Sequence, residues 1–149
     1  SISAQLLRHR SFSFQEFSQR YANVEELDSP ELPELRLQDP KNRQNSIEDP
    51  NLMNKEQLEN VIRAHYLTTY DLYKNMLAAG IAKECAREVL PMGTPTRLYM
   101  NGTLRSWIHY CDLRCANGTQ KEHRAIALDI KQLIKQNYPQ VYEVISRFS

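Results

Sequence analysis

The feature that most constrains the fold is an apolar repeat in the middle of the chain. Between Asn54 and Gly80, apolar and aromatic residues recur every three or four positions, which is the period of one face of an α-helix. Asn54 and Gln57 have the spacing of a capping box at the start of the repeat. Gly80 suits the left-handed conformation that follows many helices. The sequence therefore predicts one long helix over residues 54–80.

Shorter segments on both sides of this repeat show related patterns. We expect the end of a helix over Ile2 to Arg8, helices over 82–90 and 119–136, one beginning after Gly102, and a last one from Pro139 to near Phe148. The aromatic residues between Phe12 and Tyr21 sit among polar ones, as in an extended or strand-like segment. Together these patterns predict a single α+β domain over residues 1–149 that is mainly helical.

Charged residues are distributed unevenly, although the net charge is only +1. Residues 1–24 hold three basic and one acidic side chain, whereas residues 25–50 hold eight acidic and three basic ones. The acidic stretch contains four prolines and no long apolar repeat, so we expect a surface loop over 25–53 with a short extended piece at Leu35 to Leu37. The near-neutral total argues against a nucleic-acid-binding module.

Glycine and cysteine usage exclude other classes of site. The four glycines are too far apart for a glycine-rich phosphate loop. The three cysteines cannot all pair, and no secretory segment is present in the chain, so we expect a reducing, cytoplasmic context. Cys111 and Cys115 are one helical turn apart near His109, but no second pair completes four ligands, so we expect no metal site and cysteines that pack as small buried hydrophobes.

The densest polar cluster is Arg8-His9-Arg10, followed at short spacing by Ser13, Glu16, Ser18 and Arg20. Guanidinium groups bind phosphates and carboxylates through paired donors, so this cluster could form an anion site. It could equally be a solvated basic turn after a helix. Arginine supplies twelve of the nineteen basic residues, which favours bidentate anion recognition, and Arg87, Arg97, Arg105 and Arg114 lie further along the chain.

Residues 8–20 resemble the signature R-H-R-x-x-S-x-N-E-x-S-x-R of the flavin-dependent thymidylate synthases, with Gln15 in place of the asparagine. Residues 86–91 resemble the A-R-x-V-L-P element of that family. Residues 104–107, Leu113-Arg114, Gln120 and Glu122 resemble its C-terminal helices. Two further departures are Thr103, where asparagine is common, and Gly118, where some members have a flavin-contacting histidine.

The resemblance implies a homotetrameric enzyme of the flavin-dependent thymidylate synthase-like fold, with FAD and dUMP bound at sites shared between subunits. Such enzymes methylate dUMP to dTMP with methylenetetrahydrofolate as carbon donor and NADPH as reductant. Family members carry several dozen more residues before the position of Gln5, so a non-catalytic nucleotide- or flavin-binding fragment is the alternative. No nucleic-acid or membrane partner is implied.

The resemblance also implies roles for individual residues. The expected dUMP contacts are Gln5, Arg8, Glu16, Phe17, Ser18, Gln19, Arg20, Arg87 and Arg114. The expected FAD contacts are Arg8, His9, Arg10, Ser11, Glu16, Thr103, His109 and Leu113. Arg114 and Ser18 are the residues expected in catalysis: Arg114 would stabilise negative charge on the uracil, and Ser18 is either a nucleophile or, lacking an adjacent base, a hydrogen-bonding ligand.

Overall fold

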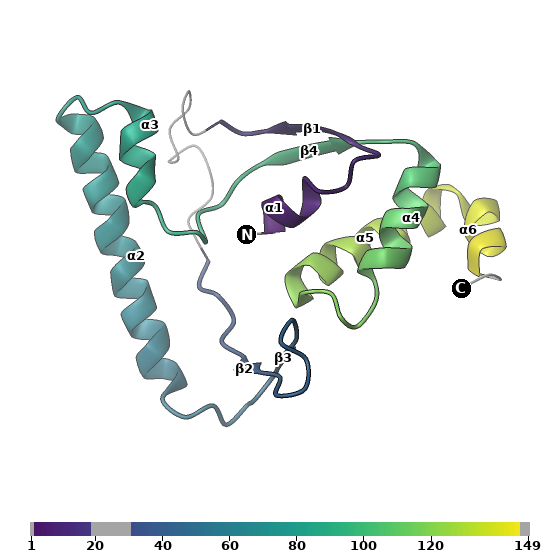
Figure 1. Cartoon of the computed structure of the whole chain (residues 1–149), viewed down its shortest axis with the longest axis horizontal. Helices are drawn as coiled ribbons and strands as arrows, with labels where there is room; N and C mark the ends of the chain where they lie inside the picture. The colour runs from purple at the N-terminus through teal and green to yellow at the C-terminus, as the bar shows by residue number, and fades with distance from the viewer. Residues whose placement is uncertain (1, 19–30, 147–149) are drawn as a thin grey trace. The chain divides into compact units, whose positions relative to one another are not determined.

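The computed structural model describes residues 2–18 and 31–146 and is rich in helices, with two pairs of short strands (Figure 1). The elements in chain order are α1 (Ile2–Leu6), β1 (Ser13–Glu16), β2 (Leu37–Gln38), β3 (Ser46–Ile47), α2 (Lys55–Ala78), α3 (Lys83–Ala86), the 3-10 helix η2 (Arg87–Val89), β4 (Leu98–Asn101), α4 (Leu104–Arg114), α5 (Lys121–Asn137) and α6 (Pro139–Ser146). β1 pairs with β4, and β2 pairs with β3. This confirms the expected α+β, mainly helical class.

The chain divides into two compact units. The first contains α2, α3 and η2, and the second contains α1, α4, α5 and α6. The division falls within both β1 and β4. A single domain over 1–149 stays a prediction. Among the described residues, no helix combines the length and apolar character needed to cross a membrane.

The long helix α2 confirms the apolar repeat, but its start differs from the prediction. Asn54 has φ 60° and ψ 21°, and its side chain makes no capping bond. A capping residue needs an extended backbone to turn its side chain toward the first N–H groups, so the predicted capping box does not form. The other end is as expected: Gly80 has φ 80°, and the N–H groups of Gly80 and Ile81 donate to the carbonyls of Leu77 and Met76, as in a Schellman motif.

The core of the first unit lies where α2 meets α3 and η2. Tyr73 and Ala86 are fully buried there. Partly buried apolar side chains pack around them: Tyr70, Met76, Leu77, Val89 and Leu90. The helix predicted over 82–90 is divided into α3 and η2, and Leu90 is already extended, because the residue before a proline disfavours helical backbone. This packing places Arg87 at the start of η2.

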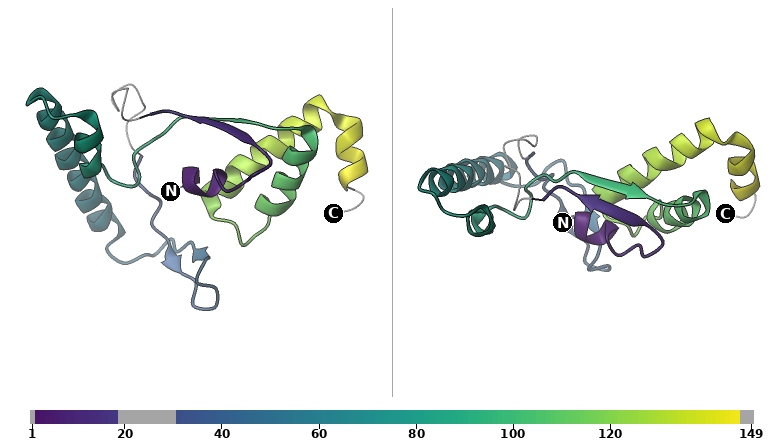
Figure 2. Two further views of the ribbon diagram at one scale, coloured as in Figure 1. Left: turned by 45° about the horizontal axis from the view of Figure 1, so that its top comes forward. Right: turned by 90° about the horizontal axis from the view of Figure 1, so that it is seen from above.

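The second unit is built around α4 and α5, which lie side by side in each view of Figure 2. Their buried contact residues are Tyr110, Cys111, His123 and Ala127. Phe12 packs against the backbone just before α4, where a Cβ on Gly102 would approach Cδ1 of the ring to 2.5 Å. Glycine is therefore required at this close approach. The contact fixes the segment that follows α1 onto α4.

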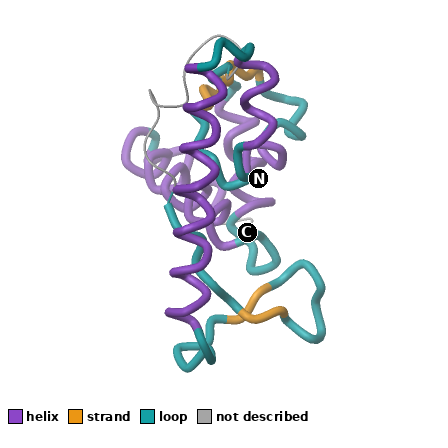
Figure 3. Tube along the Cα trace, turned by 90° about the vertical axis from the view of Figure 1, so that its left-hand side faces the viewer, coloured by secondary structure: helices purple, strands orange, loops and turns teal. Residues whose placement is uncertain are grey.

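Part of the predicted acidic loop is more ordered than expected. Residues 25–30 lie outside the described residues, but 38–47 form a hairpin between β2 and β3 (Figure 3). The carboxylate of Asp39 accepts bonds from the N–H groups of Lys41 and Asn42 and from Nδ2 of Asn45. These bonds lower the pKa of Asp39, with the Asn45 bond as the largest cause. The extended piece lies at Leu37–Gln38, slightly later than predicted.

Candidate functional site

The arginine-rich motif begins in a turn that continues from α1. The N–H of Leu7 donates to the carbonyl of Ser3, that of His9 to Leu6 and that of Phe12 to His9. The chain then enters β1, and beyond its end the N–H of Phe17 donates to the carbonyl of Arg97 over 2.8 Å. The motif is thus held by backbone bonds along a turn and a strand, and the extended segment expected near Phe12 is confirmed over β1.

His9 joins this turn to the end of α4. Nε of Arg114 donates to Nε2 of His9 over 3.0 Å, so Nε2 carries no proton and the ring proton of a neutral His9 lies on Nδ1. The His9 ring packs edge-on against Tyr110, with the ring centroids 5.0 Å apart. Burial lowers the pKa of His9, and the charges of Arg114 and His109 lower it further. His9 is therefore a neutral imidazole that orients a guanidinium.

Arg114 is the last residue of α4 and is partly buried. Its Nε is committed to His9, and among residues 2–18 and 31–146 its guanidinium makes no other hydrogen bond or ion pair. The two terminal nitrogens are therefore available to a planar acceptor such as a carboxylate, phosphate or uracil edge. A cation in the last turn is also favoured by the helix dipole.

Gln5 lies on α1, and both polar atoms of its amide side chain make hydrogen bonds. Its Oε1 is 3.1 Å from Nδ1 of His123, and its Nε2 donates to Oε1 of Gln120 over 2.7 Å. Nε2 of Gln120 in turn donates to Glu122 over 2.9 Å. His123 is not among the site residues predicted from the sequence, and its hydrogen bond to Gln5 was missed. The apolar period of α5 indicated burial and gave no signal of this bond.

Arg8 and Arg10 are both exposed on the turn after α1. Within the part of the chain that the structure describes, neither has a hydrogen-bond or ion-pair partner. Two free guanidiniums beside the neutral His9 provide donors without a carboxylate that would compete for them. This donor set fits the diphosphate of a dinucleotide such as FAD.

The predicted site residues on α4 differ in what surrounds them. Thr103 is the N-cap of α4, and its Oγ1 accepts from the N–H of Ser106 over 3.2 Å. His109 and Leu113 are exposed and four residues apart, so they share one face of the helix. Ser11 is exposed in the turn before β1. In the second unit, Arg114 and His9 therefore form one hydrogen-bonded pair, and Gln5 belongs to a second hydrogen-bonded group with His123 and Gln120. The rings of His9 and His123 lie 6.4 Å apart between centroids, and Thr103 begins the helix that ends at Arg114.

The remaining candidates belong to the first unit. Thr96 donates to Oε1 of Glu16 over 3.2 Å. Ser18 is partly buried, with no hydrogen bond to a histidine or carboxylate within 2–18 and 31–146. Nε of Arg87 lies 3.6 Å from Oε1 of Glu88. Gln19 and Arg20 lie outside the described residues, as does the end predicted for the last helix near Phe148.

The surroundings of Cys111 and Cys115 favour the protonated thiol, and the expected burial of Cys85 is corrected. Cys111 is buried and donates to the carbonyl of Ala127; burial, followed by the neighbouring Cys115 thiol, raises its pKa to about 12. Burial also raises the pKa of Cys115. Cys85, expected to be buried, is exposed because α3 turns only Ala86 into the core. Where the chain is described, no cluster of three or more potential metal ligands occurs.

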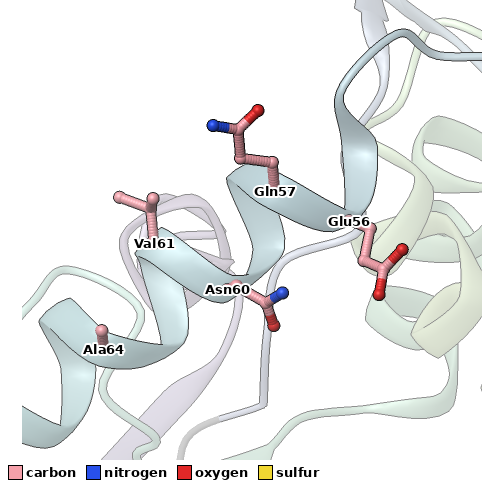
Figure 4. Close-up of a pocket in the computed structure, with 5 residues that line it drawn as sticks. All are labelled: Glu56, Gln57, Asn60, Val61 and Ala64. Carbon is pink, nitrogen blue, oxygen red and sulfur yellow. The ribbon is translucent and has the colours of Figure 1, made fainter.

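A pocket of about 460 Å³ lies on α2, and none of its lining residues is a site residue predicted from the sequence. It is lined by Glu56, Gln57, Asn60, Val61 and Ala64, which lie along one stretch of the helix (Figure 4). Its lining holds a single charged group and no arginine, so it does not resemble a phosphate site.

The chain is similar to several known proteins. A family model described as "Thymidylate synthase complementing protein" matches residues 1–140. The flavin-dependent thymidylate synthase of Synechocystis sp. is 50% identical over 141 residues, which cover 95% of this chain and 64% of that protein. A probable flavin-dependent thymidylate synthase of Paramecium bursaria Chlorella virus 1 is 47% identical over 148 residues, covering 97% of this chain and 66% of its own length.

A solved structure is similar over nearly the whole chain. The UMP/dUMP methylase PolB from Streptomyces cacaoi, bound with 5-Br UMP, matches with a TM-score of 0.82 at 25% identity, covering 99% of this chain and 70% of that one. The chain therefore spans about two-thirds of the length of the proteins that it matches. Because the family match takes in the motif, both helical units and nearly all residues between them, the chain belongs to the thymidylate synthase complementing protein family, as its motif indicated.

Proposed function

We propose that this chain is part of an FAD-dependent enzyme that methylates dUMP to dTMP, with methylenetetrahydrofolate as carbon donor and NADPH as reductant. The proposal rests on the hydrogen bond between Arg114 and His9. This bond joins the turn after α1 to a guanidinium whose two terminal nitrogens have no partner among the described residues. Relatives sharing about half of the residues are named flavin-dependent thymidylate synthases. A similar solved structure is a UMP/dUMP methylase.

The proposed role of Arg114 is to bind the uracil edge of dUMP. Negative charge develops on the uracil when C5 becomes nucleophilic, and a fixed cation lowers the energy of that state. Since His9 already holds Nε, the guanidinium needs little reordering when the nucleotide arrives. Gln5 would bind the same nucleotide, while Arg87 and Arg20 would neutralise its phosphate through charge-assisted bonds.

FAD would be held by Arg8 and Arg10 at its phosphates and by His9, Ser11, Glu16, Thr103, His109 and Leu113 along the rest of the molecule. When bound, FAD supplies hydride chemistry that no side chain can perform. The chain's own contribution is orientation and charge: two free guanidiniums, a neutral imidazole and an exposed stripe on α4.

Ser18 would bind dUMP through its hydroxyl, together with Glu16, Phe17 and Gln19. A serine nucleophile needs an adjacent base, and among the described residues Ser18 has none within hydrogen-bond distance. The proposal therefore keeps Ser18 as a ligand, and Arg114 as the residue that stabilises the reacting group.

We also propose that the active sites form in a homotetramer. Four apolar side chains of α2 are 47–63% exposed, namely Leu58, Val61, Leu67 and Leu72. Such a series on one helix suits burial against another subunit. Val61→Asp should lower the oligomer mass measured by light scattering, whereas Arg63→Asp, at an exposed position on the other side of the same helix, should not.

The activity is tested by tritium release from C5-labelled dUMP in the presence of FAD, NADPH and methylenetetrahydrofolate. We expect release that depends on NADPH, with omission of NADPH as the control. The alternative of a non-catalytic flavin- or nucleotide-binding fragment has no support from the relatives, which are named as synthases. Flavin-loaded protein that releases no tritium would overturn the enzyme proposal and favour that alternative.

A further inference from the structure

We propose that His123 is a positioning residue for Gln5, holding the amide in one orientation so that it presents a fixed N–H donor to dUMP. This inference rests on the proposed function, because it assumes that Gln5 binds the nucleotide. The bonds that carry it run from His123 through Gln5 and Gln120 to Glu122, all within the second unit.

The donor and acceptor of each hydrogen bond follow from the carboxylate of Glu122, with which the series ends. A carboxylate only accepts, so Gln120 turns Nε2 toward Glu122 and Oε1 toward Gln5. Gln5 then donates from Nε2, which turns its own Oε1 toward Nδ1 of His123. Because that oxygen can only accept, the proton of His123 must lie on Nδ1.

His123 is well suited to act as a permanent donor. Its ring is fully buried, with the Tyr110 centroid at 5.7 Å and the His9 centroid at 6.4 Å. Burial, followed by the charge of Arg114 and the neighbouring imidazole of His9, lowers its pKa to about 4. Its Nε2 is buried without a hydrogen-bond partner among the described residues. An unprotonated Nε2 agrees with this placement, because the single ring proton is used at Nδ1.

The two hydrogen bonds of the Gln5 side chain favour one of the two orientations of its amide. A free glutamine amide turns over easily, because its last torsion is broad and nearly two-fold. Here, turning it would set Nε2 against the N–H of His123 and Oε1 against Oε1 of Gln120. Both bonds would be lost and both contacts would become repulsive. The remaining hydrogen on Nε2 of Gln5 is therefore presented in a fixed direction.

The test uses two substitutions of His123 that differ in one donor. His123→Asn retains an amide N–H near the position of Nδ1, whereas His123→Leu fills the site without a donor. In FAD-loaded protein, we expect His123→Leu to weaken dUMP binding about tenfold, measured by titration calorimetry, with FAD affinity unchanged. His123→Asn should restore most of the dUMP affinity. His65→Leu, at an exposed histidine of α2, is the matched control and should change neither affinity.

Three outcomes would overturn the inference: equal dUMP affinity in His123→Leu and the parent protein, equal losses of dUMP and FAD affinity, or no rescue by asparagine. If His123→Leu does not fold, Gln120→Met removes the acceptor for Gln5 at an exposed position and must weaken dUMP binding selectively.

A measurement without nucleotide separates this inference from the proposed function. Nitrogen NMR of labelled histidine should show His123 with its proton on Nδ1 at neutral pH. A proton on Nε2 would overturn the inference even if dUMP binds. If the parent protein fails to bind dUMP, the proposed function fails, and the inference fails with it even where the tautomer is as expected.

Discussion

The two compact units hold their candidate site residues in different ways. In the second unit, Arg114 is hydrogen-bonded to His9 and Gln5 is held between His123 and Gln120, whereas Arg8 and Arg10 are exposed. In the first unit, the side chain of Arg87 is 36% exposed, and its Nε lies 3.6 Å from a still more exposed Glu88. Side chains already held in place lose less freedom on binding. Gln5, His9 and Arg114 of the second unit are therefore preorganised for a ligand, whereas an apolar core places Arg87 in the first unit.

The largest expected effect concerns the apolar core of the first unit. Tyr73→Ala should lower the free energy of unfolding by about 3–5 kcal/mol, because it removes a fully buried ring and leaves a cavity. Denaturant unfolding followed by circular dichroism measures the change. Tyr99→Ala, at a tyrosine that is 64% exposed, is the control and should have a much smaller effect. Similar losses in both variants would show that this core does not hold the unit together.

The next effect tests the preorganised unit at Arg114. Arg114→Ala should reduce turnover about 10²–10³-fold, because it removes the cation that would stabilise charge on the uracil. Arg114→Lys keeps a charge but loses both the bond to His9 and the paired donors, so it should recover little of the activity. Tritium release measures both variants. Full activity in the lysine variant would show that charge alone, and not the orientation set by His9, is what matters.

The helices could be predicted from sequence because their apolar periods are local. α2, α4, α5 and α6 all begin within a few residues of the expected starts, and α2 and α5 also end close to the expected positions. β4 was not predicted, because a four-residue strand such as Leu98–Asn101 is specified by its distant partner β1 more than by its own pattern. Asn54 was misjudged because a capping residue is recognised by spacing, while its backbone angle decides whether it caps.

The candidate site was only partly predictable for a similar reason. The motif identified His9, and the resemblance of the C-terminal helices identified Arg114. The hydrogen bond between them could not be predicted, because it joins residues that are far apart in sequence. The role of His123 could not be predicted, because a buried histidine on an apolar helix face usually packs against apolar neighbours. Its hydrogen bond to Gln5 becomes visible only when α1 is in place. Pattern reading finds the residue types of a site, whereas the bonds between them depend on tertiary packing.

A smaller effect tests how the motif turn is held onto α4. Gly102→Ala should destabilise the protein by about 1–3 kcal/mol, because a Cβ would approach the Phe12 ring to 2.5 Å. Gly118→Ala is the matched control, since nothing lies within 4 Å of a Cβ at that position. Thermal unfolding compares the two. If Gly102→Ala is as stable as Gly118→Ala, the contact between Phe12 and the backbone before α4 is not tight.

Arg87 provides the corresponding test of a less constrained candidate. Its side chain is 36% exposed and lies near an even more exposed Glu88, so it is not tightly held. Arg87→Ala should weaken dUMP binding about tenfold, because one charge-assisted contact to the phosphate is lost. Arg87→Lys should recover part of the affinity, unlike the lysine variant of Arg114. Calorimetric titration with dUMP decides this, and an unchanged affinity in Arg87→Ala would contradict the phosphate role.

The last prediction concerns the pH dependence of the free energy of unfolding. His123, buried in the second unit, contributes to this dependence, and its effect per pH unit is the smallest of those predicted. The pKa of His123 is lowered to about 4 in the folded chain, below the value of about 6.5 expected when unfolded. Between these two values the unfolded chain binds the extra proton, so stability is full above pH 6.5 and falls as the pH decreases toward 4. The slope from this residue approaches about 1 kcal/mol per pH unit.

Unfolding measured between pH 7 and pH 4 in the parent protein and in His123→Leu isolates this contribution. Carboxylates also lose favourable interactions in acid, but they contribute equally to both proteins and cancel in the difference. His9, whose pKa is lowered in the same direction, stays in the variant and preserves part of the slope. We expect a shallower profile in His123→Leu. Identical slopes would mean that His123 takes up its proton at the same pH in the folded and unfolded chains, and that burial in the second unit does not keep it neutral in acid.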